Sequence, residues 1–162
     1  MPCAIKTLLV TNDFPPTVGG IQSYLRDFAG ELARRVGAES LVVFASTQDA
    51  TAARKWDASV PYTVVRWPHR VMLPTPSTVR EMQRLIRAHG IDTVWFGAAA
   101  PLALMGPAAK RAGADTVIAS THGHEVGWTK ASIGRHALRG IGRSADIVTY
   151  ISDYTLQRLR PA

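Results

Sequence analysis

Short hydrophobic runs alternate along the chain with longer amphipathic segments. The runs are rich in β-branched residues, which is typical of parallel strands that are covered on both faces. They predict strands at Ile5–Val10, Leu41–Ala45, Tyr62–Trp67, Thr93–Phe96, Thr116–Ser120 and Ile147–Ile151.

The segment after the first strand has the three- and four-residue hydrophobic spacing of a helix. This spacing predicts a helix that Gly37 ends. We expect one face of it to pack on the sheet, formed by Ile21, Leu25, Phe28, Leu32 and Val36.

Later segments repeat the helical pattern. One helix should begin at Pro76, with Ser77 as its N-cap, and end at His89 and Gly90. Others are expected at residues 101–112, 132–142 and 153–159, the last capped by Asp153.

This succession of strands and helices predicts an α/β fold, a doubly wound parallel sheet with right-handed crossovers. Ligands of such sheets bind at the carboxyl ends of the strands. With 162 residues the chain suits one domain or one half of a larger enzyme. No composition shift precedes Ala162, so we expect a piece of a longer protein.

Composition narrows the function classes. A formal charge of +7 attracts nucleic acid, anionic lipid or phosphorylated substrates. Nucleic acid is disfavoured because no aromatic platform accompanies the arginines. The lone Cys3 permits no internal disulfide, and the N-terminus leads into a strand without a secretory signal, so we expect a cytoplasmic protein.

The loop after the first strand places Gly19 and Gly20 where the chain turns from sheet to helix. Glycines let a ligand approach the backbone, and the unpaired N–H groups of the helix that follows favour a phosphate. The same glycines could simply permit the turn. The spacing matches neither a dinucleotide fingerprint nor a P-loop, which disfavours both.

Basic residues follow the third strand. Arg66, His69 and Arg70 stand at its end, and Arg70 could make a bidentate contact with a phosphate. The next helix carries Arg80, Arg84 and Arg87, which either meet water or lie against an anionic membrane.

The loop after the fifth strand reads Thr-His-Gly-His-Glu from Thr121 to Glu125. His122, His124 and Glu125 could ligate a metal, but no further His or Cys stands at zinc spacing, so hydrogen bonding to a polar substrate is favoured. No neighbouring residue completes a hydrolase triad.

Two segments together carry a family resemblance: Thr11–Tyr24, with its Asn-Asp-Phe-Pro-Pro and Gly-Gly sequences, and Ser120–Glu125. They resemble the N-terminal half of a retaining GT-B glycosyltransferase of the fourth sequence family. Within it the chain is most similar to actinobacterial mannosyltransferases that build phosphatidylinositol mannosides. The resemblance implies that residues 1–162 form the acceptor-binding, Rossmann-like domain and that the nucleotide-sugar domain is absent from this chain.

The resemblance also implies roles for single residues. Gly19 and Gly20 would approach the donor diphosphate, and His122 would contact the transferred sugar, which makes it the catalytic candidate. Acceptor contacts are implied for Asp13, Gln22 and Arg70. His124 and Glu125 remain candidates for sugar binding.

The implied reaction transfers mannose from GDP-mannose with retention, through an oxocarbenium-like species and without a protein nucleophile, cofactor or metal. The glutamates and basic residues that serve the donor would lie in the missing half, so we expect the isolated chain to be inactive. The implied location is the inner face of the plasma membrane, on which a cytoplasmic protein would rest peripherally.

Two alternatives stay open. The chain could belong to the same family and act on another lipid or a soluble sugar. It could also be a non-catalytic module that binds phosphate or an anionic membrane. The enzyme hypothesis requires that His122 and the Gly19–Gly20 backbone meet at one rim of the sheet.

Overall fold

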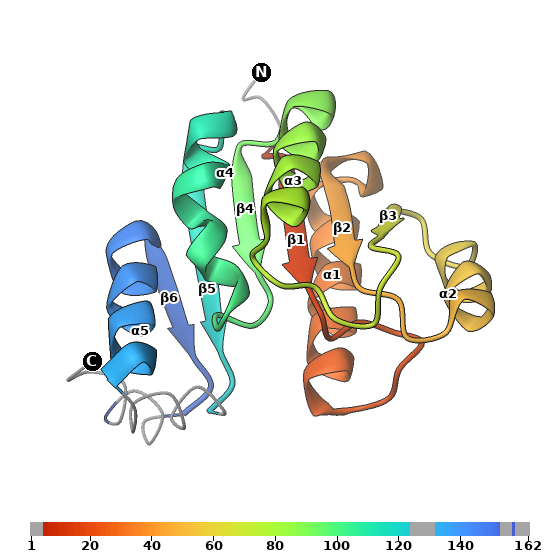
Figure 1. Cartoon of the computed structure of the whole chain (residues 1–162). Helices are drawn as coiled ribbons and strands as arrows, with labels where there is room; N and C mark the ends of the chain where they lie inside the picture. Colours follow the sequence, from red (N-terminus) through yellow and green to blue (C-terminus); the bar gives the residue numbers. More distant parts are fainter. Residues whose placement is uncertain (1–4, 124–131, 153–156, 158–162) are drawn as a thin grey trace.

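The computed structural model describes residues 5–123, 132–152 and 157. Its strands form one parallel sheet in the order β3-β2-β1-β4-β5-β6 (Figure 1). All six predicted strands are confirmed: β1 (Thr7–Thr11), β2 (Leu41–Ala45), β3 (Thr63–Arg66), β4 (Thr93–Phe96), β5 (Thr116–Thr121) and β6 (Ile147–Tyr150).

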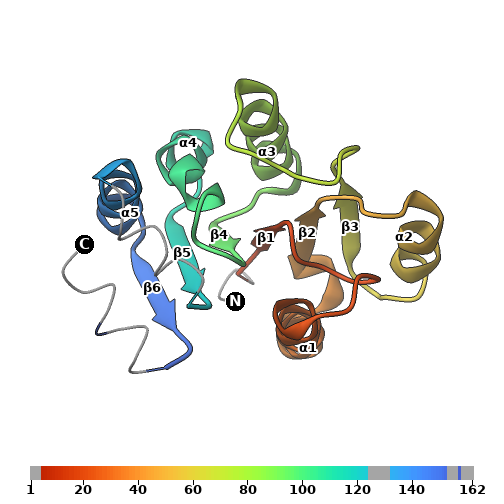
Figure 2. The same ribbon diagram turned by 60° about the horizontal axis from the view of Figure 1, so that its bottom comes forward.

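Helices cover both faces of this sheet. α3, α4 and α5 lie on one face and α1 on the other, with α2 beside the β3 edge (Figure 2). The bounds are α1 (Gly20–Val36), α2 (Ala50–Asp57), α3 (Pro76–His89), α4 (Gly106–Ala112) and α5 (Ser132–Ser144), with 3₁₀ turns η1 (Ala38–Ser40) and η2 (Leu102–Met105). The predicted doubly wound α/β class is therefore confirmed.

The core has one cluster on each face of the sheet, because successive strand residues point to opposite faces. Leu8 packs toward α3 and α4, whereas Leu9 packs toward α1. The inward row of α1 is Leu25, Ala29 and Ala33. The prediction that Phe28 packs inward is wrong: it is 53% exposed, because the two alanines occupy the central contact with the sheet.

Two local predictions also need correction. Thr75, not Ser77, caps α3: its Oγ1 accepts a hydrogen bond from the Thr78 N–H at 3.4 Å, and Pro76 then occupies the first turn. The predicted helix at residues 101–112 is divided into η2 and α4. Asp153 lies outside the described residues.

The loops that leave the carboxyl ends of the strands are bonded to one another. The Ser46 N–H donates to the Thr11 carbonyl at 3.2 Å, and the Gly97 N–H donates to the Val10 carbonyl at 3.0 Å. The ends of β2 and β4 are therefore fixed on either side of β1. Among the described residues no helix is long and apolar enough to cross a membrane.

Helix α2 was not predicted from the sequence, and Asp49 is the residue that starts it. The Asp49 Oδ1 accepts hydrogen bonds from the N–H groups of Thr51 and Ala52, both at 2.9 Å. Only Ala53 of this helix is buried. Trp56 packs partly buried against the core, and the N-cap adds to the stability of this short helix.

Replacing Asp49 by Ala should lower the free energy of unfolding by about 1 kcal/mol, because two N–H groups lose their acceptor. Chemical denaturation would measure the change. Asp49→Asn is the matched control, since its amide oxygen keeps the acceptor and should retain most of the stability. Equal losses in both variants would contradict a capping role.

Candidate functional site

The loop after β1 is tied to the loop before α3 by the side chain of Asn12. Its Nδ2 donates to the Met72 carbonyl at 2.9 Å, and its Oδ1 accepts from the Met72 N–H at 2.6 Å. The Ser46 hydroxyl also donates to the Asn12 carbonyl at 2.9 Å. Loops that follow three different strands are thus joined around one residue.

Arg66, at the end of β3, holds the same β1 loop from another side. Its guanidinium forms an ion pair with Asp57 at 2.7 Å and donates to the carbonyls of Pro15 and Ser46 at 2.6 and 3.1 Å. The guanidinium carbon lies 5.8 Å from the centre of the Phe14 ring. Burial raises the pKa of nearby Tyr62, and the Asp57 charge adds to the effect. Because these contacts occupy its guanidinium, Arg66 has a structural role.

Asp13 and Gln22 lie together at the start of α1. The Gln22 Nε2 donates to the Asp13 Oδ1 at 3.0 Å, and the Asp13 N–H donates to the Thr11 hydroxyl at 2.9 Å. The structure thus brings two of the three predicted acceptor residues into contact. Arg70 stands two residues before Met72, and its own carbonyl accepts from the Gln48 amide at 2.5 Å.

Gly19 is the N-cap of α1, and no side chain caps this helix end. Gly19 has an extended backbone, with φ of 174°, that any residue adopts, and a Cβ there would meet the flexible Gln22 amide. A Cβ on Gly20 would meet nothing within 4 Å. The chain's own packing therefore does not require glycine at position 20, where the backbone borders open space.

His122 follows β5 and lies against α1. Its Nε2 is 2.6 Å from the Gly97 carbonyl, and its ring contacts the edge of Tyr24 with centroids 5.2 Å apart. Because a carbonyl only accepts, Nε2 carries a proton in this contact. Tyr24 is four residues after Gly20, so the imidazole contacts a side chain that leaves α1 about one helical turn after the glycine loop.

The Gly97 carbonyl, which accepts the hydrogen bond from His122, lies close to α1 because residue 97 has no side chain. A Cβ at this position would lie 2.7 Å from the Leu25 Cδ1 and 3.1 Å from the Thr11 Cβ. A side chain here would require Leu25 and Thr11 to shift, so glycine favours the close approach of β1, β4 and α1.

An apolar groove of about 230 Å³ lies on the α1 face of the sheet, and one of its lining residues, Tyr24, also contacts His122. Hydrogen bonds satisfy its polar floor, since the Trp95 Nε1–H and the Thr149 hydroxyl both donate to Ser120 Oγ, at 2.8 and 2.9 Å. Its lining is Tyr24, Phe28, Leu32, Trp95, Ile118, Ser120 and Thr149. The groove suits an apolar rather than a charged group.

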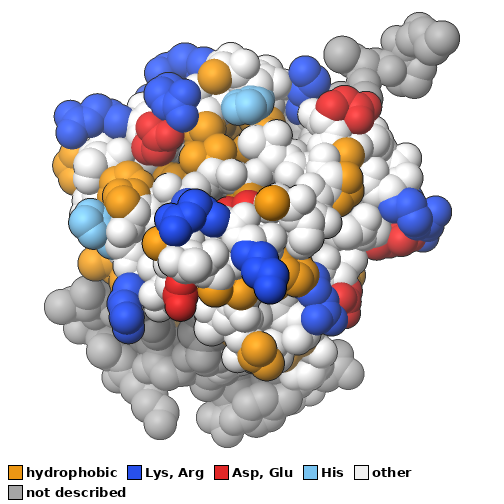
Figure 3. Space-filling view, turned by 90° about the vertical axis from the view of Figure 1, so that its right-hand side faces the viewer, with side chains coloured by type: hydrophobic (Ala, Val, Ile, Leu, Met, Phe, Trp, Pro, Cys, Tyr) orange, Lys and Arg blue, Asp and Glu red, His pale blue; other side chains and the backbone are white. Residues whose placement is uncertain are grey.

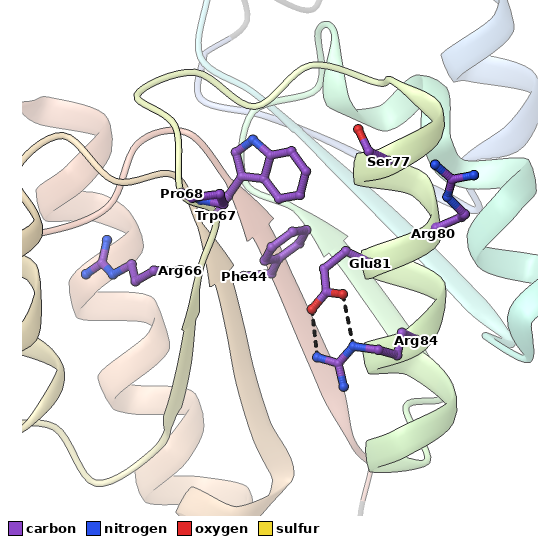
Figure 4. Close-up of a pocket in the computed structure, with 8 residues that line it drawn as sticks. All are labelled: Phe44, Arg66, Trp67, Pro68, Ser77, Arg80, Glu81 and Arg84. Carbon is purple, nitrogen blue, oxygen red and sulfur yellow. Dashed lines mark hydrogen bonds and ion pairs between the residues drawn. The ribbon is translucent and has the colours of Figure 1, made fainter.

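A second hollow, of about 410 Å³, lies between β3 and α3 (Figure 4). Phe44 and Trp67 meet edge to face at its base, with centroids 6.1 Å apart. Glu81 is bound by Arg84, whose hydrogen bond lowers the pKa of the Glu81 carboxyl. Figure 4 shows Arg66 pointing away from this hollow, while Arg80 extends from α3 near Ser77.

Sequence reasoning located the edge of the sheet but missed some of its residues. His124 and Glu125 lie outside the described residues. The roles of Asn12 and Tyr24 were missed, although both belong to the quoted motif, because their partners are distant in sequence. Within the described part of the chain, no group of His, Cys, Asp or Glu side chains is arranged to hold a metal ion.

Comparison with known proteins adds a family. The sequence model described as Glycosyltransferase Family 4 matches residues 18–162. Among solved structures, Anabaena HepE in complex with UDP and glucose superposes with a TM-score of 0.67 and 17% identity, over 97% of this chain and 41% of HepE. This likeness shows the fold alone.

Curated relatives are much closer in sequence. A GDP-mannose-dependent monoacylated alpha-(1-6)-phosphatidylinositol monomannoside mannosyltransferase of Corynebacterium glutamicum is 58% identical over 100% of this chain and 42% of its own length. GDP-mannose-dependent alpha-(1-6)-phosphatidylinositol monomannoside mannosyltransferases of Mycolicibacterium smegmatis and Mycobacterium tuberculosis are 54% and 52% identical over 96% and 97% of this chain, and 40% and 41% of their own. The chain thus spans about two fifths of these relatives.

Replacing Arg66 by Met should lower the free energy of unfolding by roughly 2–3 kcal/mol, because Asp57 and two carbonyls lose a largely buried partner. Urea denaturation would measure it. Arg34→Met is the control, since Arg34 pairs with Glu31 on the exposed surface of α1, and little change is expected. A loss no larger than the control's would contradict the assigned role.

Proposed function

Because this chain belongs to glycosyltransferase family 4, we propose that it is the acceptor-side half of a mannosyltransferase. The complete enzyme would transfer mannose from GDP-mannose to a phosphatidylinositol mannoside lipid with retention of configuration. The observation that carries the proposal is the identity of 52–58%, over nearly the whole chain, to enzymes named as GDP-mannose-dependent phosphatidylinositol monomannoside mannosyltransferases. Residues 1–162 would form the N-terminal half of a GT-B enzyme whose nucleotide-sugar domain follows.

The arrangement at the start of α1 supports a role in donor binding. The uncapped helix end and the open space beside Gly20 would accept the donor diphosphate, which the N-terminal dipole favours. His122, whose ring contacts Tyr24 of the same helix, would contact the sugar attached to that diphosphate.

The Asp13–Gln22 pair supports a role in acceptor binding. Carboxylate and amide groups accept and donate hydrogen bonds to the hydroxyls of a sugar or inositol ring. Arg70 would contact the phosphate of the lipid headgroup, because its guanidinium matches phosphate geometry. The two glycines would thus bind the donor, and Asp13, Gln22 and Arg70 would bind the acceptor.

The proposed mechanism needs no nucleophile from this chain. As the bond between mannose and diphosphate breaks, positive charge grows on the sugar, and the departing diphosphate helps to deprotonate the acceptor hydroxyl. The His122 ring, held by the Gly97 carbonyl, would position the sugar during this step. Groups that neutralise the diphosphate would come from the C-terminal half, so the isolated chain would not turn over GDP-mannose. We also propose that the reaction needs no metal.

The lipid acceptor places the reaction at a membrane. We propose that the protein works in the cytoplasm, peripherally on the inner face of the plasma membrane, where its +7 formal charge favours anionic lipid.

The full-length gene product should transfer radiolabelled mannose from GDP-mannose to phosphatidylinositol monomannoside. Thin-layer separation of the lipid product would measure the transfer, with the 162-residue chain as the inactive control. Transfer to a soluble sugar but not to the lipid would reject the acceptor assignment. Absence of transfer to both acceptors would reject the hypothesis that the protein is a mannosyltransferase.

In the full-length protein, Gly20→Ala should reduce kcat/KM roughly a hundredfold, because the added methyl fills the space proposed for the diphosphate. Thermal unfolding should show equal or higher stability, since Ala favours a helix more than Gly. Gly30→Ala is the matched control: it lies on the same helix, also borders open space, and should keep full activity. Equal activities in the two variants would contradict a donor contact at Gly20.

A further inference from the structure

Two rows of side chains on α1 face the sheet. The first is the buried row that packs on the strands. Because residues four positions apart lie on the same side of a helix, Tyr24, Phe28 and Leu32 form a second row beside it. Tyr24 and Leu32 are partly buried against the core, whereas Phe28 is 53% exposed. The second row therefore lies at the flank of the helix, where it lines the groove over β4 and β5.

Aromatic contacts connect this second row to His122. The ring centroids of Tyr24 and His122 are 5.2 Å apart, and the ring planes meet at 81°, which is an edge-to-face contact. Tyr24 also packs against Phe28, with centroids 4.6 Å apart, and Phe28 meets Trp95 at 6.1 Å. The Trp95 indole is held in turn by its hydrogen bond to the Ser120 hydroxyl. A series of ring contacts thus connects His122, through α1, to the buried strand β4.

This aromatic series differs from the surface on the β3 and α2 side of the molecule. There, Figure 3 shows hydrophobic side chains interspersed with Lys, Arg, Asp and Glu. Scattered exposed hydrophobic side chains are ordinary in globular proteins. On α1, the exposed Phe28 ring instead contacts two other aromatic rings. Because an exposed ring adds little to the core, Phe28 acts mainly through the rings that it contacts.

Two of the contacts of the His122 imidazole restrain it in different ways. The hydrogen bond from its Nε2 to the Gly97 carbonyl, at 2.6 Å, holds one corner of the ring. A ring held at one atom can still turn about that bond. The edge-to-face contact with Tyr24 favours one ring plane, and such a contact shifts an equilibrium by roughly two- to tenfold. The hydrogen bond therefore fixes where the imidazole lies, and Tyr24 restrains how its plane is turned.

We propose that Tyr24 is a positioning residue, whose ring fixes the plane of the His122 imidazole so that it meets the transferred sugar in one orientation. The proposal rests on the proposed function, in which His122 contacts that sugar. Tyr24 belongs to the helix that begins at Gly20. The backbone proposed to hold the diphosphate and the ring that orients the imidazole thus share one rigid element, which would hold the donor sugar in a fixed relation to His122.

Two substitutions of Tyr24 in the full-length protein separate orientation of the imidazole from direct contact with substrate. Tyr24→Leu removes the ring and should lower kcat roughly tenfold, with little change in the KM for GDP-mannose, because the donor still binds but its sugar is positioned less well. Tyr24→Phe keeps the ring and should retain kcat within about twofold. Equal losses in the two variants would assign the effect to the hydroxyl and overturn the proposal.

Tyr150→Leu is the matched control, because it makes the same exchange close to the site. Tyr150 is 38% exposed and lies beside Thr121, the residue directly before His122, in the register of β5 and β6. This variant should keep the kcat of the wild type. A loss as large as that of Tyr24→Leu would show a general sensitivity of this edge of the sheet and would contradict a specific role of Tyr24.

Nuclear magnetic resonance of the full-length protein, labelled in its histidines, gives a readout that lower stability alone would not change. The signal that His122→Gln removes identifies the His122 ring. Its Nε2 proton should be protected from exchange with solvent in the wild type, in Tyr24→Phe and in Tyr150→Leu, because the Gly97 carbonyl accepts it. In Tyr24→Leu the proton should exchange faster and the ring signals should shift. Circular dichroism would establish that each variant is folded.

The two readouts fail separately. Unchanged His122 signals in Tyr24→Leu would overturn the proposal, whatever the activity. Changed signals with an unchanged kcat would show that the reaction does not use this orientation and would also overturn the positioning role. Absence of mannose transfer by the wild type, together with the expected signals, would reject the proposed function but leave Tyr24 as the residue that orients the imidazole.

Discussion

The two hydrogen bonds between the Asn12 amide and the Met72 backbone connect parts of the chain that are 60 residues apart. The Asn12 side chain thus pairs with the N–H and carbonyl of Met72 in the way that the backbone of a neighbouring β-strand would. The position of Asp13 on one side and of the loop before α3 on the other both follow from this connection. Because the amide is part-buried, losing it would leave two backbone groups without partners.

The strands were predictable from sequence because each is a short apolar run between turn residues, and parallel strands carry their own burial signal. Helix α2 was not, because it is short and only Ala53 and the partly buried Trp56 mark its inward face, which leaves the hydrophobic periodicity weak. The remaining sequence signal for this helix was Asp49, a residue type that favours the N-cap position. Phe28 fitted the helical period, but the period alone does not show that Ala29 and Ala33 allow closer packing.

The edge that carries the candidate site was also predictable, since parallel strands end together and their loops must meet. Which side chains of this edge contact one another was not predictable. The commitment of Arg66 to Asp57 and the meeting of His122 with Tyr24 depend on distances in three dimensions that no local pattern encodes. The roles of the glycine loop and His122 stay predictions of the family resemblance, which the geometry accommodates.

The contact between His122 and Gly97 has a consequence for how the site tolerates mutation. The oxygen that orients the imidazole belongs to the main chain, so no exchange of side chain deletes it. What can change is the space around it, because a side chain at position 97 would require Leu25 and Thr11 to shift. The backbone contribution to the orientation of the ring therefore depends on the close packing of β1, β4 and α1 around Gly97.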